Sequence, residues 1–379
     1  MNVDVLEQAL GSGEDSFTEF KQAEVHPDQM AAEMIAFANA EGGTIYIGID
    51  DQGQVVGVDN PKLEEWVVQV ARNNCDPAMF PVIKKINYRG KQVLAVYIAR
   101  GTTAYSNNKG QYFIRVGSTK QVPSKEELAR LFQHRAMFCF DESPVPVTDL
   151  PDLALDKINA YLKKIGQAPI EQSLIDQTQL LNNLKITHQA QPTIAGLLLF
   201  GKSGILPQSG VSAAAFAGAD VSAKTSDAKN IEGTLPDQLS EALHFVERNM
   251  SIKSEINGLQ RHDHPEYDRL VVREALVNAL AHRDYSITGS RIRLNMFADR
   301  LEISSPGGLP NTLTLENIKT IQYSRNPIVV SFLTGLGYME RRGEGIMRMI
   351  RGSQSIGALA PRFDLPDRQL FRVTLYKAG

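Results

Sequence analysis

Two pairs of carboxylates near the start of the chain have the residue types of a metal site. Glu14 and Glu19 lie beside a short predicted strand, in which the alternation of side chains places Glu19 and Lys21 on the same side. Asp50 and Asp51 follow an apolar predicted strand, where a turn can direct them back over the sheet edge. Mg²⁺ and Mn²⁺ prefer oxygen ligands, so convergence of the two pairs would create a site for phosphate chemistry. Spacing by itself favours the ordinary alternative of solvent-facing strand and turn residues.

Charge is distributed unevenly along the first third of the chain. Residues 1–71 contain 14 Asp and Glu but 2 Lys and Arg, whereas residues 72–135 contain 3 and 12. An acidic cluster beside a basic face would suit a metal-dependent nuclease, because carboxylates hold the cation and basic side chains contact phosphates. Two solvated faces are an equally acceptable alternative. The candidate phosphate contacts are Lys84, Lys85, Arg89, Lys91, Arg115 and Lys120, and Tyr46, Tyr105 and Tyr112 could stack on exposed bases.

A third group of polar residues lies along an otherwise apolar helix. The pattern predicts a helix over residues 267–282, with Glu274, Asn278 and His282 in one row, four residues apart. Burying this row without polar partners would cost several kcal/mol. One occupant is a magnesium nucleotide, with Asn278 as a metal ligand and Glu274 orienting or deprotonating a water. An internal salt bridge to an arginine is the alternative that spacing favours.

The composition is that of an ordinary globular protein. With 42% hydrophobic and 22% charged residues, the chain is neither disordered nor collagen-like. Its two cysteines, Cys75 and Cys139, are too few for a disulfide framework and suggest a reducing compartment. The N-terminal residues lack the order of a secretory signal, and the most apolar stretch, residues 194–200, is far shorter than the ~18 residues that cross a bilayer. We therefore expect a cytoplasmic protein that does not contact a membrane.

The elements that must position these residues divide the chain of 379 residues into several parts. The predicted division is a first domain over residues 1–135, a proline-containing linker over 136–152, a middle α/β region over 153–254 and a third domain over 255–379. The first domain is predicted to contain a helix over 30–39, a hairpin of strands 44–49 and 54–58, strands over 82–88, 92–98 and 111–116, and a closing helix over 124–135. In that last helix Ser124 and Glu127 have the spacing of a capping box. The later elements are helices over 156–165, 171–184, 236–249, 267–282 and 340–351 and strands over 291–296, 300–304 and 370–376.

Three segments of the first domain resemble the Schlafen AlbA-like domain. They are EDSFTEFK at residues 14–21, AFANAEGGTIYIGIDD at 36–51 and YFIRVGS at 112–118. In the nuclease branch of that family, two glutamates separated by four residues and an aspartate after the Gly-Gly strand hold a divalent metal for RNA cleavage. The resemblance assigns these roles to Glu14, Glu19 and Asp51, with Asp50 as the adjacent alternative, and it implies that Lys21 or Arg115 neutralises developing charge. Other prokaryotic members only bind nucleic acid or act as regulators.

Residues 265–379 resemble the GHKL ATPase fold in the divergent form of RecG-like proteins. The segment 274–279 is similar to the helix motif whose Glu and Asn serve hydrolysis and Mg²⁺ binding, which points to Glu274 and Asn278. The first glycine box of the family corresponds to Gly307 and Gly308, and the second corresponds to Gly343 and Gly345. Such glycines let the backbone approach ATP phosphates closely. Two positions depart from the family pattern: Ser304 replaces an adenine-binding aspartate, and Met347 replaces a glycine.

The combination implies an α+β protein with a Schlafen AlbA-like domain, a mixed middle region and a GHKL-like α/β sandwich. The function it implies first is a metal-dependent endoribonuclease, using Mg²⁺ or Mn²⁺ on structured RNA such as tRNA and gated by ATP at the C-terminal domain. The alternatives are an ATP-responsive, DNA-binding transcriptional regulator without nuclease activity, and an ATPase scaffold in a defence or repair assembly. A homodimer or higher oligomer is expected by analogy alone.

Overall fold

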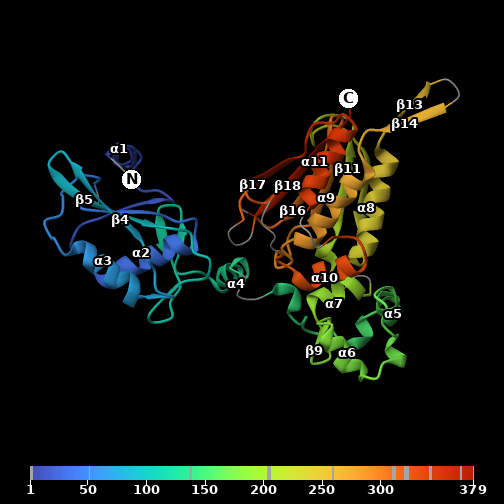
Figure 1. The fold of residues 1–379 in the computed structure, drawn as a ribbon, viewed down its shortest axis with the longest axis horizontal. Helices are drawn as coiled ribbons and strands as arrows, with labels where there is room; N and C mark the ends of the chain where they lie inside the picture. Colours follow the sequence, from blue (N-terminus) through green and yellow to red (C-terminus); the bar gives the residue numbers. More distant parts are fainter. Residues whose placement is uncertain are drawn as a thin grey trace. The chain divides into compact units, whose positions relative to one another are not determined.

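The computed structural model of the chain forms two compact units, residues 1–138 and 139–379 (Figure 1). The residues that the structure describes are 3–50, 52–135, 139–202, 206–257, 260–309, 313–319, 324–340, 344–367 and 369–378. Both units mix helices with sheets, which confirms the predicted α+β class. None of the helices in these ranges combines the length and the apolar surface needed to span a bilayer.

The N-terminal unit is built on a four-stranded sheet with the order β1-β2-β5-β4. Strand β1 pairs in parallel with β2, and the other pairs are antiparallel. Figure 1 shows α1 on one side of this sheet and α2 and α3 on the other. The elements are α1 (Val3–Ser12), β1 (Thr18–Lys21), α2 (Pro27–Asn39), β2 (Gly43–Ile47), α3 (Leu63–Asn73), β3 (Cys75–Asp76), β4 (Val82–Tyr88), β5 (Lys91–Ile98), β6 (Ser106–Asn107), β7 (Ile114–Val116), β8 (Thr119–Gln121) and α4 (Lys125–His134).

Alternation along the strands supplies a separate core on each face of this sheet. Ile45 and Ile47 pack with the buried side of α2, whereas Phe20 and Tyr46 pack with Leu6 of α1. Helix α2 is buried on nearly all sides, from Met30 to Asn39. The α2 face therefore has little contact with water, and charged groups on it need partners within the protein.

The predicted hairpin of strands 44–49 and 54–58 does not form as a two-stranded ladder, because β2 pairs with β1 and β5 instead. The two segments are joined by an isolated bridge between Ile49 and Val55 and by bonds from the Asp50 and Val56 N–H groups to the Gln54 and Gly48 carbonyls. The Asp50 carboxylate accepts hydrogen bonds from the N–H groups of Gln52 and Gln54, at 3.0 and 2.8 Å. This side-chain turn closes the loop after β2, so the turn residues were recognised correctly but the strand pairing was not.

The C-terminal unit is built on a six-stranded sheet with the order β12-β11-β15-β16-β18-β17. Helices α8 and α9 pack against the sheet, and α11 packs on α9 (Figure 1). The helices and 3₁₀ turns are η1 (Phe140–Glu142), η2 (Leu150–Asp152), α5 (Leu155–Lys164), η3 (Ile170–Gln172), α6 (Gln177–Asn183), α7 (Ile194–Phe200), η4 (Pro207–Ser209), α8 (Leu235–Asn249), α9 (Arg269–His282), α10 (Pro327–Gly335) and α11 (Gly345–Ser355). The strands are β9 (Thr187–His188), β10 (Gln191–Pro192), β11 (Val211–Phe216), β12 (Thr225–Ile231), β13 (Ile252–Asn257), β14 (Gln260–Pro265), β15 (Ile292–Met296), β16 (Arg300–Pro306), β17 (Arg362–Asp367) and β18 (Leu370–Tyr376).

The structure does not divide the chain where the sequence suggested a border between a middle region and a third domain. Strand β11 pairs in parallel with β15, so residues from both sides of position 254 share one sheet and one core. Most of the segment predicted as a linker, residues 136–152, is also not a separate connector. The Ile194 N–H donates to the Ser143 carbonyl and the Val145 N–H donates to the Pro192 carbonyl, both at 2.9 Å. Residues 139–152 therefore belong to the C-terminal unit, because their backbone groups are paired inside it.

Candidate functional site

The predicted catalytic residue Glu19 faces the buried side of the sheet, toward α2. Its register partner on β2 is Ile45, which packs on the α2 side. From α2, Glu33 contributes a second buried carboxylate. Hairpin β7–β8 packs against α2, so three elements meet around two carboxylates.

Three cations neutralise these two carboxylates. Lys21 forms an ion pair with Glu19 and lies 3.7 Å from Glu33. Arg115 Nη2 lies 2.8 Å from Glu19 Oε2, and Arg115 Nη1 lies 3.5 Å from Glu33 Oε2. Lys120 Nζ lies 2.9 Å from Glu33 Oε1. We call these five residues the Glu19 cluster; its formal charge is positive.

Arg115 is a structural residue of this cluster. Its side chain is 1% exposed, and it donates to the carbonyls of Asp15 and Thr18. The guanidinium also lies 4.3 Å from the centre of the Phe37 ring. In this structure the Arg115 guanidinium is buried and engaged within the domain, so the predicted phosphate contact at Arg115 has no support from its position. Lys120 differs, since its side chain is 26% exposed and pairs with Glu33 alone among the described residues.

Glu14, the other predicted catalytic glutamate, is exposed and lies at the free edge of β1. Its Oε1 accepts from the Phe20 N–H at 2.9 Å, which satisfies a backbone donor that no neighbouring strand uses. Burial lowers the pKa of Lys21, but the bond to Glu19 and the charges of Glu19, Glu33 and Glu14 raise it more, so the net shift is upward. Glu14 and Glu19 thus both act on the Lys21 ammonium.

The segment before the predicted Asp50 and Asp51 ligands also approaches Lys21. The N–H groups of Gly48 and Ile49 donate to the Lys21 carbonyl, at 2.7 and 3.2 Å. The Asp50 carboxylate is bonded to the backbone N–H groups of its own loop. Asp51 lies outside the described residues. Within the described part of the chain, no three His, Cys, Asp or Glu side chains form a group that could hold a metal ion. Because the predicted ligand Asp51 is not among these residues, metal binding stays a prediction.

The other predicted phosphate contacts are divided between exposed and paired lysines and arginines. Lys84 and Arg89 are exposed on β4 and at the tip of the β4–β5 hairpin. Lys85 lies 3.1 Å from Glu64, and Lys91 donates to the Val55 carbonyl at 2.9 Å. Lys84 and Arg89 are therefore the two of these four that remain available to a phosphate.

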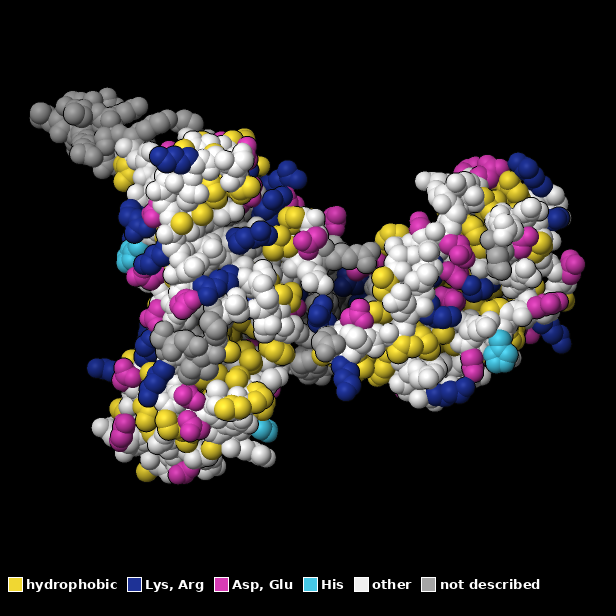
Figure 2. Space-filling model, turned by 180° about the vertical axis from the view of Figure 1, so that it is seen from behind, with side chains coloured by type: hydrophobic (Ala, Val, Ile, Leu, Met, Phe, Trp, Pro, Cys, Tyr) yellow, Lys and Arg dark blue, Asp and Glu magenta, His cyan; other side chains and the backbone are white. Residues whose placement is uncertain are grey.

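Ion pairs join the acidic and the basic segment of the first domain. Arg100 pairs with Glu41 and Lys109 with Asp28, at 3.2 and 2.8 Å, so basic residues of the second segment neutralise acidic residues of the first. On the face drawn in Figure 2, basic and acidic side chains are interspersed over the N-terminal unit. The predicted acidic cluster beside a basic wall is absent from this view.

The three tyrosines that the sequence suggested for base stacking are engaged inside the domain. Tyr46 is 2% exposed, and Tyr112 packs edge to face on Phe132 with 5.2 Å between ring centres. Tyr105 is half-buried against the α2 core, and its N–H donates to Asn39 at 2.8 Å. Sequence reasoning selected tyrosines near the motifs and missed Tyr97, which is 42% exposed on β5. No local pattern signals this exposure, because Tyr97 shares its face of β5 with the buried Val93 and Ala95.

In the C-terminal unit, Glu274 and Asn278, two of the three residues in the predicted polar row of α9, contact each other. Asn278 Nδ2 donates to Glu274 Oε1 at 3.2 Å, and Arg348 of α11 lies 3.7 Å from Glu274 Oε2. Gly345 packs directly on this pair, since a Cβ there would lie 2.2 Å from Glu274 Oε1. The ion pair between Arg348 and Glu274 is the internal salt bridge that the sequence spacing favoured over a bound nucleotide. Nucleotide binding by this pair stays a prediction.

The predicted first glycine box has an internal role in the described structure. A Cβ at Gly307, where φ is +109°, would lie 2.0 Å from Arg325 Nη1, and Arg325 pairs with the buried Asp284. Arg325 Nη2 also donates to the Gly308 carbonyl at 2.6 Å. In this structure the space beside Gly307 and Gly308 is therefore filled by the Arg325 guanidinium. Gly343 of the second box lies outside the described residues, and Ser304 is buried opposite Arg372 in the sheet.

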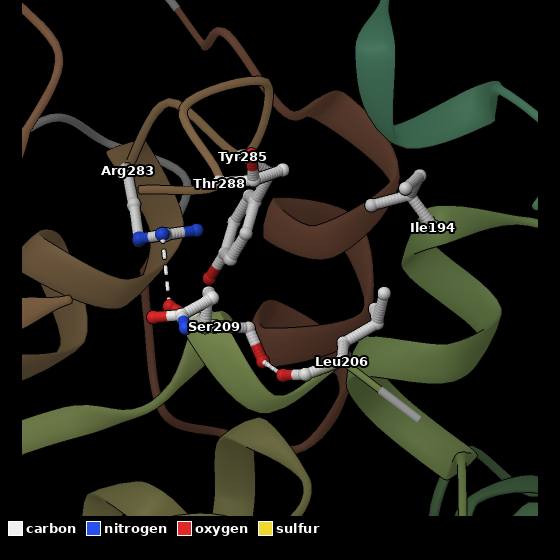
Figure 3. A pocket seen from close by; sticks show the side chains of 7 residues that line it. Ile194, Leu206, Ser209, Arg283, Tyr285 and Thr288 are labelled. Carbon is white, nitrogen blue, oxygen red and sulfur yellow. Dashed lines mark hydrogen bonds between the residues drawn. The ribbon is translucent and has the colours of Figure 1, made fainter. Parts of the chain in front are cut away.

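A cavity of about 180 Å³ lies beside α7 and η4 in the C-terminal unit (Figure 3). Arg283 lines it and donates to the carbonyls of Gln208, Ile287 and Ser290, at 3.0, 3.0 and 2.7 Å. Its guanidinium also lies 4.8 Å from the centre of the Tyr285 ring. These bonds tie the loop after α9 to the η4 turn, so Arg283 serves the fold. The lining residues are Ile194, Leu206, Gln208, Ser209, Arg283, Tyr285 and Thr288.

Comparison with known families agrees with both resemblances. Residues 14–124 match the family described as Schlafen, AlbA_2, and residues 289–375 match the family described as ATP-dependent DNA helicase recG C-terminal. The chain combines a Schlafen-like and a RecG C-terminal-like domain. Residues 129–208 match a domain of unknown function. The two named matches together indicate a nucleic-acid-related protein.

Solved structures resemble the Schlafen-like and RecG-like chain at low identity. The DIP2311 protein of Corynebacterium diphtheriae is 23% identical with a TM-score of 0.52, over 99% of this chain and 80% of that one. This likeness shows the shared fold. The N-terminal domain of a RecG-related helicase protein of Nitrosomonas europaea is 24% identical with a TM-score of 0.26, over 32% of this chain and 94% of that one. No relative was found among curated proteins.

Proposed function

We propose that this protein binds nucleic acid through its Schlafen-like domain and acts as a regulator that does not cut the nucleic acid. The ion pairs of Glu19 carry the part of this proposal that denies cleavage. Both oxygens of Glu19 are in ion pairs, one with Lys21 and one with Arg115. The match of residues 14–124 to the Schlafen AlbA_2 family supports the first half.

The burial and ion pairs of the Glu19 cluster support the proposal that its carboxylates do not serve as metal ligands. Moving Glu19 to a metal would take from the Arg115 guanidinium, which is 1% exposed, the closer of its two carboxylate partners. Breaking a buried ion pair from one side typically costs about 3–5 kcal/mol. The role that we propose for the Glu19 carboxylate is to hold the strand, helix and hairpin together.

A specific observation also favours a second candidate, metal-dependent endoribonuclease activity. Glu14 and Glu19 both act on the Lys21 ammonium, and the Gly48 and Ile49 N–H groups hold the following segment near Lys21. A divalent ion that displaced this ammonium would be approached by both glutamates. Mg²⁺ or Mn²⁺ would then lower the pKa of a bound water and polarise the scissile phosphate.

One experiment separates the two functions. Purified protein is incubated with labelled tRNA, single-stranded RNA and duplex DNA, in Mn²⁺ or in EDTA, and both retention and cleavage are measured. The variant is Glu14→Gln, which keeps an oxygen to accept from the Phe20 N–H and alters an exposed side chain. The matched control is Glu41→Gln, another exposed glutamate with a single ionic partner.

We expect binding without cleavage in wild type and both variants. Cutting that needs Mn²⁺, persists in Glu41→Gln and disappears in Glu14→Gln would establish the endoribonuclease instead. Failure of the wild type to retain any of the three nucleic acids would refute both functions.

A further inference from the structure

The sheet of the Schlafen-like domain is only partly covered on the side of α1. Phe20, Tyr46 and Ala95 lie side by side on neighbouring strands and are buried together with Leu6 of α1. The next position along this cross-strand row, on the edge strand β4, is Lys84, which is exposed. Helix α1 therefore covers β4 at Ile86, which is buried with Leu6, but leaves Lys84 of the same strand open.

The adjacent cross-strand row is open to solvent. In register order it consists of Thr18, Thr44, Tyr97 and Val82, one residue from each of the four strands. Tyr97 is 42% exposed and Val82 is 54% exposed, and the two threonines are half-buried. Alternation gives this row the same face as the row that α1 covers. We call the open row together with Lys84 the Tyr97 surface.

We propose that the Tyr97 surface binds single-stranded nucleic acid, with one base stacked on the Tyr97 ring and a phosphate at Lys84. The inference rests on the proposed function and names its binding face and substrate class. An exposed aromatic ring on a flat sheet accepts the face of any base. The Thr18 and Thr44 hydroxyls can each donate and accept one hydrogen bond at a base edge or sugar.

Charge and geometry favour this occupant. Among the described residues, no carboxylate pairs with Lys84, whereas its neighbour Lys85 pairs with Glu64 on the other face. Arg89, also exposed, continues the positive charge to the tip of the β4–β5 hairpin. A cation beside an aromatic ring suits a chain that alternates phosphates and bases. In a duplex the base faces are already stacked and cannot reach the ring, so single strands are favoured.

The test measures fluorescence anisotropy of labelled 12-nucleotide single strands of RNA and DNA and of a 12-base-pair duplex. The full-length variants are Tyr97→Ala, Tyr97→Phe and Lys84→Ala, with Lys109→Ala as a control that removes an exposed lysine elsewhere in the domain. All change exposed side chains, and thermal unfolding of each variant checks that the fold is kept.

We expect Tyr97→Ala to weaken single-strand binding roughly tenfold or more, in line with the loss of one stacked base. Tyr97→Phe keeps the ring and should stay within about twofold of wild type. Lys84→Ala should weaken binding and reduce its salt dependence by about one charge. The Lys109→Ala control should leave both quantities unchanged.

Three results would overturn the inference while the proposed function stands. The first is equal binding by wild type and Tyr97→Ala, and the second is duplex binding as tight as single-strand binding. The third is that Tyr97→Ala loses self-association and keeps nucleic-acid binding. The last result, seen by sedimentation, would assign the surface to a second copy of the chain. Absence of any nucleic-acid binding by the wild type would remove the proposed function itself.

Discussion

At the scale of single residues, burial decides what a charge does in this protein. Arg115 and Lys85 belong to the same basic segment of the sequence, and each pairs with a glutamate. The Arg115 pair is buried and bridges a strand, a helix and a hairpin, whereas Lys85 and Glu64 are each about half exposed. A surface pair contributes little because water solvates both ions well, so only the first should matter for folding.

Replacing Arg115 tests this distinction. Arg115→Met should lower the free energy of unfolding of the Schlafen-like domain by about 3–5 kcal/mol, because Glu19 and Glu33 lose a buried cationic partner. Lys85→Met, the control, should change it by less than about 1 kcal/mol. Urea denaturation measures both. Equal losses in the two variants would show that burial of the Glu19 cluster is not what stabilises the domain.

At the scale of elements, the ends of helices are fixed by side chains from near and far in the sequence. Helix α4 begins with the predicted capping box, in which Ser124 and Glu127 bond to each other's backbone N–H groups. Helix α10 is capped from a distance. Asp141 of η1 accepts from the Ile328 and Val329 N–H groups, at 2.9 and 3.1 Å, so the region predicted as a linker holds a helix of the C-terminal unit.

The Asp141 cap should make stability depend on pH. Burial raises the pKa of Asp141 to about 6, despite the opposing N–H bonds of α10. A carboxyl whose pKa is raised in the folded state favours folding in acid, and this contribution is lost as pH rises from about 4 to about 6. Stability of the C-terminal unit should fall over that range by up to about 3 kcal/mol. Asp141→Asn keeps an acceptor but does not titrate, so its stability should change less between these pH values.

Urea denaturation of the C-terminal unit at pH 4, 5, 6 and 7 measures this effect. The informative quantity is the difference between wild type and Asp141→Asn, because other groups titrate equally in both. A difference that stays constant across the four pH values would mean that Asp141 is ionised at the same pH in the folded and unfolded states.

At the scale of the whole molecule, each unit has its own hydrophobic cores. The N-terminal unit is closed near its end by Arg135, which is buried and donates to the carbonyls of Gly101, Ala38, Asn39 and Ala40. Burial and the nearby charge of Arg100 lower the pKa of Arg135 to about 10. It remains charged at neutral pH, and its bonds lock the end of α4 onto the end of α2.

A fragment of residues 1–138 should therefore fold by itself. Its thermal transition should coincide with one of two transitions of the full chain. Arg135→Met should destabilise the fragment by about 3 kcal/mol, since buried carbonyls lose a charged donor, and in the full chain it should shift only the matching transition. Scanning calorimetry measures each. A single transition of the full chain that moves as a whole in Arg135→Met would contradict independent folding of the units.

The sequence by itself determined the features that depend on neighbouring residues. The bounds of β4 and β18, the capping box at Ser124 and the two family motifs follow from local periodicity and residue type, and the structure and comparisons confirm them.

Only the tertiary structure decided which charged side chains pair with one another. Arg115 lies about a hundred positions from Glu19 in the chain, and β11 reaches its partner β15 across α8 and α9. Such pairings depend on which faces pack together, and no local pattern encodes them. The exposure of Tyr97 is of the same kind, because the limited cover by α1 leaves that end of the sheet open.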